Sequence, residues 1–388
     1  MIALCLKFWY NQNMDKFDLI ITSASGVESV VKNELRTLGF TSPRCNDGKI
    51  LLSGNGYDIA RINMFSGSAD RVYIKLTSFY ADTFDMLFEY VNSFDWIPIL
   101  PFNAKIIVTG KSKSSKLFAL SSIQSIIKKA ILTRLSQHYK RKVFPENGVV
   151  YRIEFHIDKD EVTLLLNTSG DGLHKRGYRD LVGEAPIRET LAYAMLSLSD
   201  FSAENPFCDP FCGSGTIVIE GARKALGIAP GRDRKFDFTY WDFIPSDAYK
   251  IAREEAIDRE TPDKKLRFYG FDINPDAISI ASHHAEKAGV RNKIHLQVQD
   301  VANFKNRYKN GCIVTNPPYG ERLMDATSVA GIYKTLGNVY KELDNWSLFA
   351  ITSAPNFEKA FGKKAPKNRK LYNSNKECHF YMYSKKDI

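Results

Sequence analysis

The sequence predicts an α/β protein with a C-terminal Rossmann-like parallel sheet, preceded by two smaller α+β units. Strand and helix patterns alternate in series after about residue 200, which is typical of a parallel sheet covered by helices. Polar or glycine-rich residues follow four successive predicted strands of that region. Upstream, residues 96–145 contain ten basic and no acidic residues. With 388 residues, 44% of them hydrophobic, the chain is long and apolar enough for several packed domains.

The first α+β unit is predicted over residues 15–81, after an N-terminal extension at residues 1–14. Between Val27 and Leu38 apolar residues recur at helical spacing, and Gly39 follows where such a helix would end. The expected elements are strands at 17–21, 49–52 and 72–77 and helices at 27–38 and 58–65.

The second α+β unit is predicted over residues 82–170. Its last two strands are separated by a short turn at Asp158–Asp160. Ser169–Gly172 is small and polar, and we interpret it as a flexible linker to the next domain. The expected elements are helices at 85–94 and 121–138 and strands at 105–109, 150–156 and 161–167.

The basic stretch lies on the loop and the long helix of this second unit. A net charge of +10 concentrated in this way favours a polyanionic partner, and RNA is the polyanion we expect. A solvated basic face is the plainer alternative. The candidate RNA-binding residues on this unit are Lys111, Lys113, Lys116, Lys128, Lys129 and Arg134.

The third region, residues 171–388, contains the predicted parallel sheet. Residues 229–266 form a long insertion between its first two strands, with a helix expected at 247–259 and no role that the sequence assigns. The remaining elements are strands at 207–209, 267–272, 294–298, 311–315 and 347–352 and helices at 216–226, 276–288 and 329–343.

The residues that follow these strands predict a ligand site, because ligands of parallel sheets bind beyond the carboxyl ends of the strands. After the first strand, "DPFCGSGT" (209–216) combines an acid with two glycines that allow close approach to a ligand, and no Lys-Ser/Thr pair typical of a triphosphate loop follows. Asp272 ends the second strand, where a carboxylate can bind both hydroxyls of a ribose. The alternative is that Asp272 or Asn274 caps the helix that Pro275 starts.

Composition argues against several other classes of protein. The six cysteines form no CxxC pair and no Cys/His cluster, so we expect neither a metal site nor a disulfide framework, and a reducing cytoplasm fits best. The apolar segment 1–10 is interrupted by Lys7 and has no cleavage site, so we expect no signal peptide and no membrane span. Either Met1 or Met14 could be the start, and no oligomeric state is indicated.

Four motifs in this order, "DPFCGSGT", "GFDIN", "QD" and "NPPYG", resemble the class I S-adenosylmethionine (SAM)-dependent methyltransferases that modify amino groups of bases. Upstream, "GLHKRGYR" (172–179) and "APIRETLA" (185–192) are similar to segments of RNA methyltransferases that carry a THUMP domain, and "RKLYN" (369–373) fits their closing hairpin. Within this group the chain looks most like the bacterial enzymes that methylate guanine N2 in large-subunit ribosomal RNA. Residues 1–13 and the insertion depart from the pattern.

The resemblance implies a ferredoxin-like unit, a THUMP RNA-binding domain and a methyltransferase domain, with SAM as the cofactor. It also implies roles for individual residues. Lys175, Arg176 and Arg179 would contact RNA phosphates, with salt bridges between the domains as the alternative reading, and Arg188, Glu189 and Thr190 would contact the methionine end of SAM unless they simply begin a helix after Pro186. The remaining implied cofactor residues are Asp209, Pro210, Phe211, Gly213, Gly215, Thr216, Asp272, Ile273, Asp300 and Asn316.

The motif Asn316-Pro317-Pro318-Tyr319 is the predicted catalytic site. The Asn316 side-chain oxygen and the Pro317 carbonyl can each accept an N–H of an exocyclic amine, which leaves its lone pair directed at a methyl donor. Two prolines would hold these acceptors rigidly, and Tyr319 would stack on the base. A rigid turn that merely closes a buried strand is the alternative.

The expected reaction is methylation of guanine N2 in 23S ribosomal RNA, with transfer RNA as the alternative substrate. Similar motifs occur in DNA adenine methylases and in enzymes that methylate a glutamine amide of proteins. The segment after residue 320 leaves no room for a DNA-recognition domain, and a protein methylase would not need the basic unit. An inactive RNA-binding assembly factor is the remaining alternative from another class.

Overall fold

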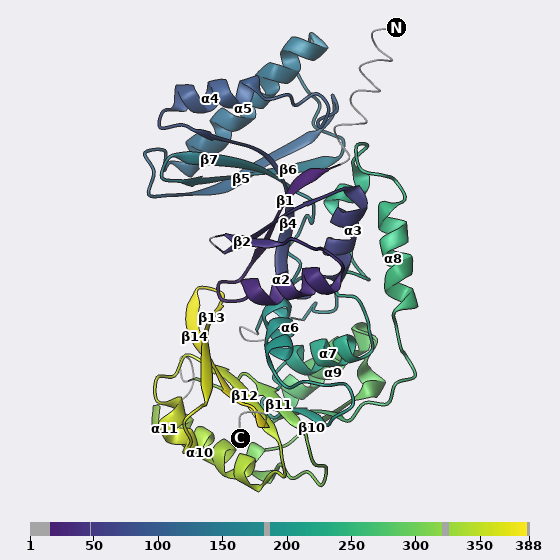
Figure 1. The fold of residues 1–388 in the computed structure, drawn as a ribbon, viewed down its shortest axis with the longest axis vertical. Coiled ribbons are helices and arrows are strands. Elements are labelled where there is room, and N and C mark those ends of the chain that lie inside the picture. The colour runs from purple at the N-terminus through teal and green to yellow at the C-terminus, as the bar shows by residue number, and fades with distance from the viewer. Residues whose placement is uncertain (1–15, 47, 182–186, 320–325, 386–388) are drawn as a thin grey trace.

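Two seven-stranded sheets at opposite ends of an elongated molecule dominate the computed structural model (Figure 1). It describes residues 16–46, 48–181, 187–319 and 326–385. The predicted N-terminal extension, and Pro186 with its predicted helix start, lie outside these residues. In the described part of the chain, no helix is long and apolar enough to cross a membrane.

The N-terminal sheet has the strand order β2-β3-β1-β4-β7-β6-β5 and is mainly antiparallel. The two predicted α+β units therefore share one sheet, because the twelve-residue strand β4 pairs with β1 on one side and with β7 on the other. Its strands are β1 (Phe17–Ser23), β2 (Arg44–Asn46), β3 (Lys49–Gly54), β4 (Ala69–Tyr80), β5 (Lys105–Lys113), β6 (Val150–Asp158) and β7 (Glu161–Asn167).

The helices of this half use the apolar stripes expected from the sequence. Val30, Val31 and Leu35 are buried in the first helix, and Trp96, fully buried, donates its indole N–H to the Val91 carbonyl at 2.8 Å. Figure 1 shows α4 and α5 packed at the far end from the C-terminal sheet. The helices are α2 (Glu28–Thr37), α3 (Gly56–Phe65), α4 (Phe84–Ser93) and α5 (Leu120–Tyr139).

The C-terminal sheet has the order β10-β9-β8-β11-β12-β14-β13, and all of its strand pairs except those of β14 are parallel. The strand order reverses at β8, which lies between β9 and β11, so ligands are expected at this point. Its strands are β8 (Phe207–Asp209), β9 (Phe268–Asp272), β10 (Ile294–Val298), β11 (Cys312–Thr315), β12 (Ser347–Thr352), β13 (Lys367–Asn373) and β14 (Lys376–Tyr383).

Helices cover this sheet, and the closing hairpin predicted at 369–373 is present as β13 and β14. The α/β fold class is therefore confirmed, although the last two strands break the parallel pattern. Figure 1 shows the hairpin reaching up toward α2 of the other half, where Arg369 donates to Ser29 at 2.8 Å. The helices are α6 (Glu189–Leu198), α7 (Thr216–Ala225), α8 (Ala248–Asp258), α9 (Pro275–Lys287), α10 (Ala326–Glu342) and α11 (Phe357–Phe361), with short 3-10 turns η1 (Asp237–Tyr240), η2 (Arg291–Lys293) and η3 (Val301–Asn303).

The segment predicted as a flexible linker is instead fixed in place. Ser169 and Gly170 are buried, and Asn167 accepts hydrogen bonds from both of their backbone N–H groups. The buried Arg234 guanidinium donates to the carbonyls of Gly172 at 2.7 Å and Asp171 at 2.8 Å. Small residues are used here because the chain crosses a packed interface, where larger side chains would not fit; a Cβ on Gly170 would lie 2.5 Å from Asp237.

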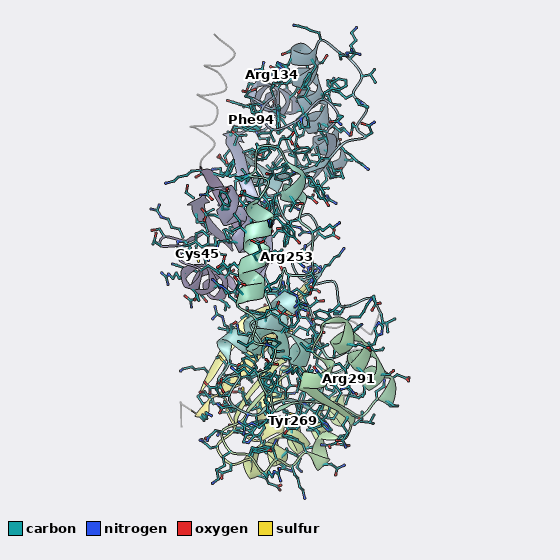
Figure 2. All side chains as sticks on the ribbon, turned by 90° about the vertical axis from the view of Figure 1, so that its right-hand side faces the viewer. Cys45, Phe94, Arg134, Arg253, Tyr269 and Arg291 are labelled. Carbon is teal, nitrogen blue, oxygen red and sulfur yellow. The ribbon has the colours of Figure 1, made fainter. Side chains whose placement is uncertain are left out.

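The insertion 229–266 packs along the N-terminal sheet as a strap. Helix α8 lies beside α3 (Figure 1), and Figure 2 shows Arg253 of α8 between the ends marked by Arg134 and Tyr269. Arg61 of α3 forms a two-pronged ion pair with Glu255 of α8, with N–O distances of 2.7 and 2.8 Å. Trp241 stacks on Tyr151 of β6, with ring centroids 5.4 Å apart. The strap therefore joins the catalytic half to both units of the other half.

Candidate active site

Three side chains identified from the sequence lie at the carboxyl ends of adjacent strands. Asp209 ends β8, Asp272 ends β9, and Asn316 follows β11. Because β8 is hydrogen-bonded between the other two strands, the three residues share one edge of the sheet. The strand order reverses at β8, in the middle of this edge, and the edge is the candidate active site.

The glycine loop turns from β8 into α7 along this edge. Gly213 and Gly215 have φ angles of +51° and +85°, which disfavour any other residue. A Cβ on Gly215 would come within 3.0 Å of Ala281 in α9. The Gly213 N–H donates to the Asp272 carboxylate at 3.0 Å, so the loop and the second acid form one unit.

Asp209 has a different role from the cofactor contact that we predicted. Its side chain is 1% exposed, and Oδ1 accepts hydrogen bonds from the Thr315 hydroxyl at 2.6 Å and from the Phe211 N–H at 3.2 Å. Burial raises the pKa of Asp209 to about 7, and the Thr315 hydrogen bond only partly offsets this. Asp209 thus joins the glycine loop to β11 beneath the site. Pro210 is buried, and Phe211 packs against the core around Ile313.

The edge near β9 has the features that a nucleoside needs. Asp272 does not cap α9; Asn274 does so by accepting from the Asp276 N–H, so the capping alternative applies to Asn274 only. Ile273, directly after the acid, is 66% exposed and offers an apolar surface to an adenine ring. Asp300 accepts from the Ala302 N–H and is exposed at the start of η3, where a carboxylate oxygen remains accessible.

Three buried polar atoms at the start of α6 and around the start of α7 have the chemistry to bind the amino-acid part of SAM. The Ser214 and Thr216 hydroxyls and Glu189 Oε2 are buried and have no hydrogen-bond partner among the described residues. Such atoms are costly unless a ligand satisfies them. Hydroxyls can donate to a carboxylate, and a glutamate oxygen can accept from an ammonium. The residues present therefore fit this group.

Glu189 and its neighbours have further partners in the structure. Glu189 Oε1 forms an ion pair with Arg179 at 3.1 Å, and burial raises the pKa of Glu189. The Thr190 hydroxyl donates to Asp70 of the N-terminal sheet at 3.2 Å. Arg188 is exposed at the start of α6. Of the three predicted residues, Glu189 retains the clearest opportunity to bind the cofactor.

The catalytic motif is held by side chains from outside it. The Tyr333 hydroxyl donates to the Pro318 carbonyl at 2.8 Å and also bonds Thr352 at 3.0 Å. Asn373 of the hairpin contacts the Tyr319 hydroxyl at 3.5 Å, and the Lys376 ammonium lies 4.6 Å from the centre of the Tyr319 ring. Asn316 is partly exposed and Pro317 is buried. Contacts from α10 and the hairpin therefore fix the Pro318 carbonyl and the Tyr319 ring.

The three basic residues before this domain separate into different roles. Arg176 is 2% exposed, so the prediction that it contacts RNA is wrong. Its guanidinium donates to the carbonyls of Leu173 and Gly67 and lies 3.6 Å from Glu220 of α7. This supports the domain-bridging alternative. Arg179 pairs with Glu189, whereas the exposed Lys175 ammonium pairs with Asp171 at 3.2 Å.

The basic stretch lies on β5 and α5, at the end of the molecule where Arg134 is labelled in Figure 2. Lys111, Lys113 and Lys129 are exposed. Lys116 pairs with Asp82 at 2.6 Å, and Lys128 pairs with Glu146 at 2.7 Å, so part of their charge is already compensated. Arg134 is only partly exposed. Three of the predicted RNA-binding lysines thus have exposed side chains, and their role in RNA binding stays a prediction.

Sequence reasoning missed Tyr333, Asn373 and Lys376, which act on the motif from α10 and the hairpin. These residues are far in sequence from Pro318 and Tyr319, so no local pattern pointed to them.

The structure shows no metal-binding cluster in the part of the chain that it describes. Within these residues, no group of three or more His, Cys, Asp or Glu side chains could hold a metal ion.

The fold and this edge together define a class I methyltransferase that uses SAM. The solved structure of SMU.472 complexed with S-adenosylhomocysteine (SAH) is 39% identical, with a TM-score of 0.91 over 95% of this chain and 98% of that chain. The chain belongs to the family with the RMKL-like methyltransferase domain, which matches residues 176–382. Residues 18–73 match the RlmL ferredoxin-like domain, and residues 81–167 match the THUMP domain.

Similar proteins carry names that differ in the substrate. A Bacillus subtilis protein named "Putative RNA methyltransferase YpsC" is 41% identical over 95% of this chain and 96% of its own length. The ribosomal RNA large subunit methyltransferase K/L of Shewanella frigidimarina is 32% identical over 95% of this chain, which spans only 53% of that protein. A Listeria monocytogenes structure described as a predicted N6-adenine-specific DNA methylase is 42% identical, with a TM-score of 0.90 over 97% of this chain and 98% of that chain.

Proposed function

We propose that this methyltransferase transfers a methyl group from SAM to the exocyclic N2 of a guanine in 23S ribosomal RNA. The observation that carries the proposal is the position of Asn316–Tyr319 at the end of β11, where Asp209 joins the preceding residue Thr315 to the glycine loop. The THUMP match and the names of the relatives support RNA as the substrate class.

Asn316 and Pro317 carry the chemistry in this proposal. The guanine amine is a poor nucleophile because its lone pair is delocalised into the ring. Two acceptors, the Asn316 side-chain oxygen and the Pro317 carbonyl, can bind its two N–H groups and favour a pyramidal nitrogen, which stabilises the transition state. SAM supplies an electrophilic methyl group when bound. No strong base is required, because the methylated ammonium loses its proton readily to water.

Rigid support for these acceptors comes from the neighbouring residues. Tyr333 fixes the Pro318 carbonyl, and the buried Asp209 ties Thr315, the residue before Asn316, to the glycine loop. The positions of the donor loop and the acceptor motif are therefore coupled, as a reaction that depends on alignment requires. The Tyr319 ring can stack on the target base, which must leave its helix to reach the edge.

The experiment that tests this function compares nucleosides from cells with and without the gene. Digested ribosomal RNA, transfer RNA and genomic DNA are analysed by mass spectrometry. Loss of N2-methylguanosine from 23S RNA is the expected result, and loss confined to transfer RNA would favour the alternative substrate. Loss of N6-methyladenine from DNA, as the name of the Listeria relative would suggest, would refute the RNA assignment. Unchanged nucleosides throughout would favour an inactive assembly factor.

A further inference from the structure

A cavity of about 370 Å³ lies where the two halves of the molecule meet. The N-terminal half contributes Ser25, in the turn after β1, and Asp70 of β4; the start of α6 contributes Arg188, and the hairpin contributes Tyr372 and Asn375. The cavity therefore exists only because three separate parts of the fold are assembled. Its size is at the lower end of small-molecule sites, which fits a single nucleotide unit.

The lining combines the groups that bind different parts of a nucleotide. The Arg188 guanidinium is suited to a phosphate, and the Tyr372 ring is suited to stacking on a base. The Asp70 carboxylate can accept N–H groups from a base edge. Burial raises the pKa of Asp70, with the Thr190 hydrogen bond and nearby Arg188 opposing this. A base N–H would give this poorly solvated carboxylate a second donor beside the Thr190 hydroxyl.

The cavity lies next to the catalytic motif and is distinct from it. No residue of Asn316–Tyr319 is among those that line it. Asn373, which contacts Tyr319, lies directly between Tyr372 and Ser374, which both line the cavity. The hairpin therefore borders both the cavity and Tyr319.

We propose that this cavity binds a second nucleotide of the RNA strand that carries the target base. Arg188 binds its phosphate, Tyr372 supports its base, and Asp70 accepts an N–H from the base edge. The inference rests on the proposed function, and it adds a substrate-binding site to which the ferredoxin-like half contributes directly. It also predicts a preference for guanine next to the target, because guanine presents two adjacent N–H groups to one carboxylate.

The test measures binding of the four ribonucleoside 5′-monophosphates to the full-length protein saturated with SAH, by NMR titration. Ser25→Trp fills the cavity from an exposed position, and Ser42→Trp is the matched control on an exposed loop of the same half. Asp70→Asn keeps the shape and changes the acceptor. We expect Ser25→Trp to weaken nucleotide binding at least tenfold, about 1.4 kcal/mol, with no effect of Ser42→Trp. Asp70→Asn should weaken guanosine monophosphate most, because guanine presents two adjacent N–H groups, N1–H and N2–H, to a carboxylate.

Three results would overturn the proposal. Wild-type protein that binds no mononucleotide up to about 10 mM would exclude the site. Binding that is lost in Asn316→Ala and retained in Ser25→Trp would place the nucleotide in the catalytic site. A loss of SAH affinity in Ser25→Trp would assign the cavity to the cofactor. If cells lacking the gene retain all methylated nucleosides while Ser25→Trp still abolishes nucleotide binding, the proposed function fails and the nucleotide site stands.

Discussion

The buried Asp209 carboxyl group makes the stability of the catalytic edge depend on pH. Its folded-state pKa of about 7 lies above the ordinary value of 3.8, because burial disfavours the charged form. The folded protein therefore binds a proton more tightly than the unfolded chain. This contribution to stability is present in full below pH 3.8 and is lost as pH rises through 7.

The size of the effect follows from the difference between the two pKa values. Each pKa unit corresponds to about 1.4 kcal/mol. Ionisation of Asp209 should therefore lower the free energy of unfolding by about 3 kcal/mol as pH rises from 5 to 8. Asp209→Asn keeps an oxygen for the Thr315 and Phe211 hydrogen bonds and cannot ionise. The variant should thus gain stability relative to the wild type as pH rises.

The assay is denaturant unfolding of both proteins from pH 5 to pH 8. The difference between them isolates Asp209, because the half-buried His156 and His174, whose pKa values are lowered to about 3 and about 4 mainly by desolvation, act in both proteins and with the opposite sign. They lower stability as pH falls below 6.5. A difference that stays constant over this range would refute the assignment of a raised pKa to Asp209.

Four further predictions concern catalysis and binding. Asn316→Ala should lower kcat by about 100-fold, close to 3 kcal/mol, with SAM affinity unchanged in calorimetry; wild-type turnover would contradict the mechanism. Tyr333→Phe removes the hydrogen bond to Pro318, so kcat should fall roughly 5- to 10-fold at unchanged KM for SAM; a lower melting temperature with normal kcat would make Tyr333 purely structural. Asp272→Ala should weaken SAM binding and leave RNA affinity intact, and equal SAM binding would limit Asp272 to holding Gly213. Replacing the exposed Lys111, Lys113 and Lys129 by Gln should lower the number of counterions released on RNA binding by about three. This number is the slope of log affinity against log salt concentration, measured by filter binding. An unchanged slope would return this surface to a solvated face, and the control replaces Lys334, Lys359 and Lys364, also exposed.

The sheet and its catalytic edge were predictable because strand ends carry local signals. The acids, the glycine pair and the Asn-Pro-Pro-Tyr motif each stand within a few residues of a strand, and the topology of a parallel sheet brings such positions together. The roles of Asp209 and Arg176 were not predictable in this way. An acid at a strand end and an arginine before a domain look the same in sequence whether they face a ligand or a buried partner.

Contacts between distant segments were also beyond sequence reasoning. The turn at Ser169–Gly172 has the composition of a flexible linker, yet Arg234, more than sixty residues later, fixes it through backbone carbonyls. The continuity of the N-terminal sheet depends on β4 pairing with β7 across two predicted units. Composition and periodicity describe each segment by itself, and neither specifies its partner.

The strap has a consequence for how this chain can be divided. Covalently, residues 229–266 belong to the C-terminal half. However, Trp241 stacks on Tyr151 and Phe243 contacts Phe17 of the other half, and Ile244 is buried in the same core. A cut near residue 170 would leave the N-terminal fragment without the strap and would expose aromatic surface on both products. The boundaries that sequence comparison draws are therefore unsuitable places to separate this protein. The smallest fragment that keeps its apolar surfaces buried is nearly the whole chain. A truncated protein that loses activity would therefore first indicate disrupted packing, and only then the removal of a binding site.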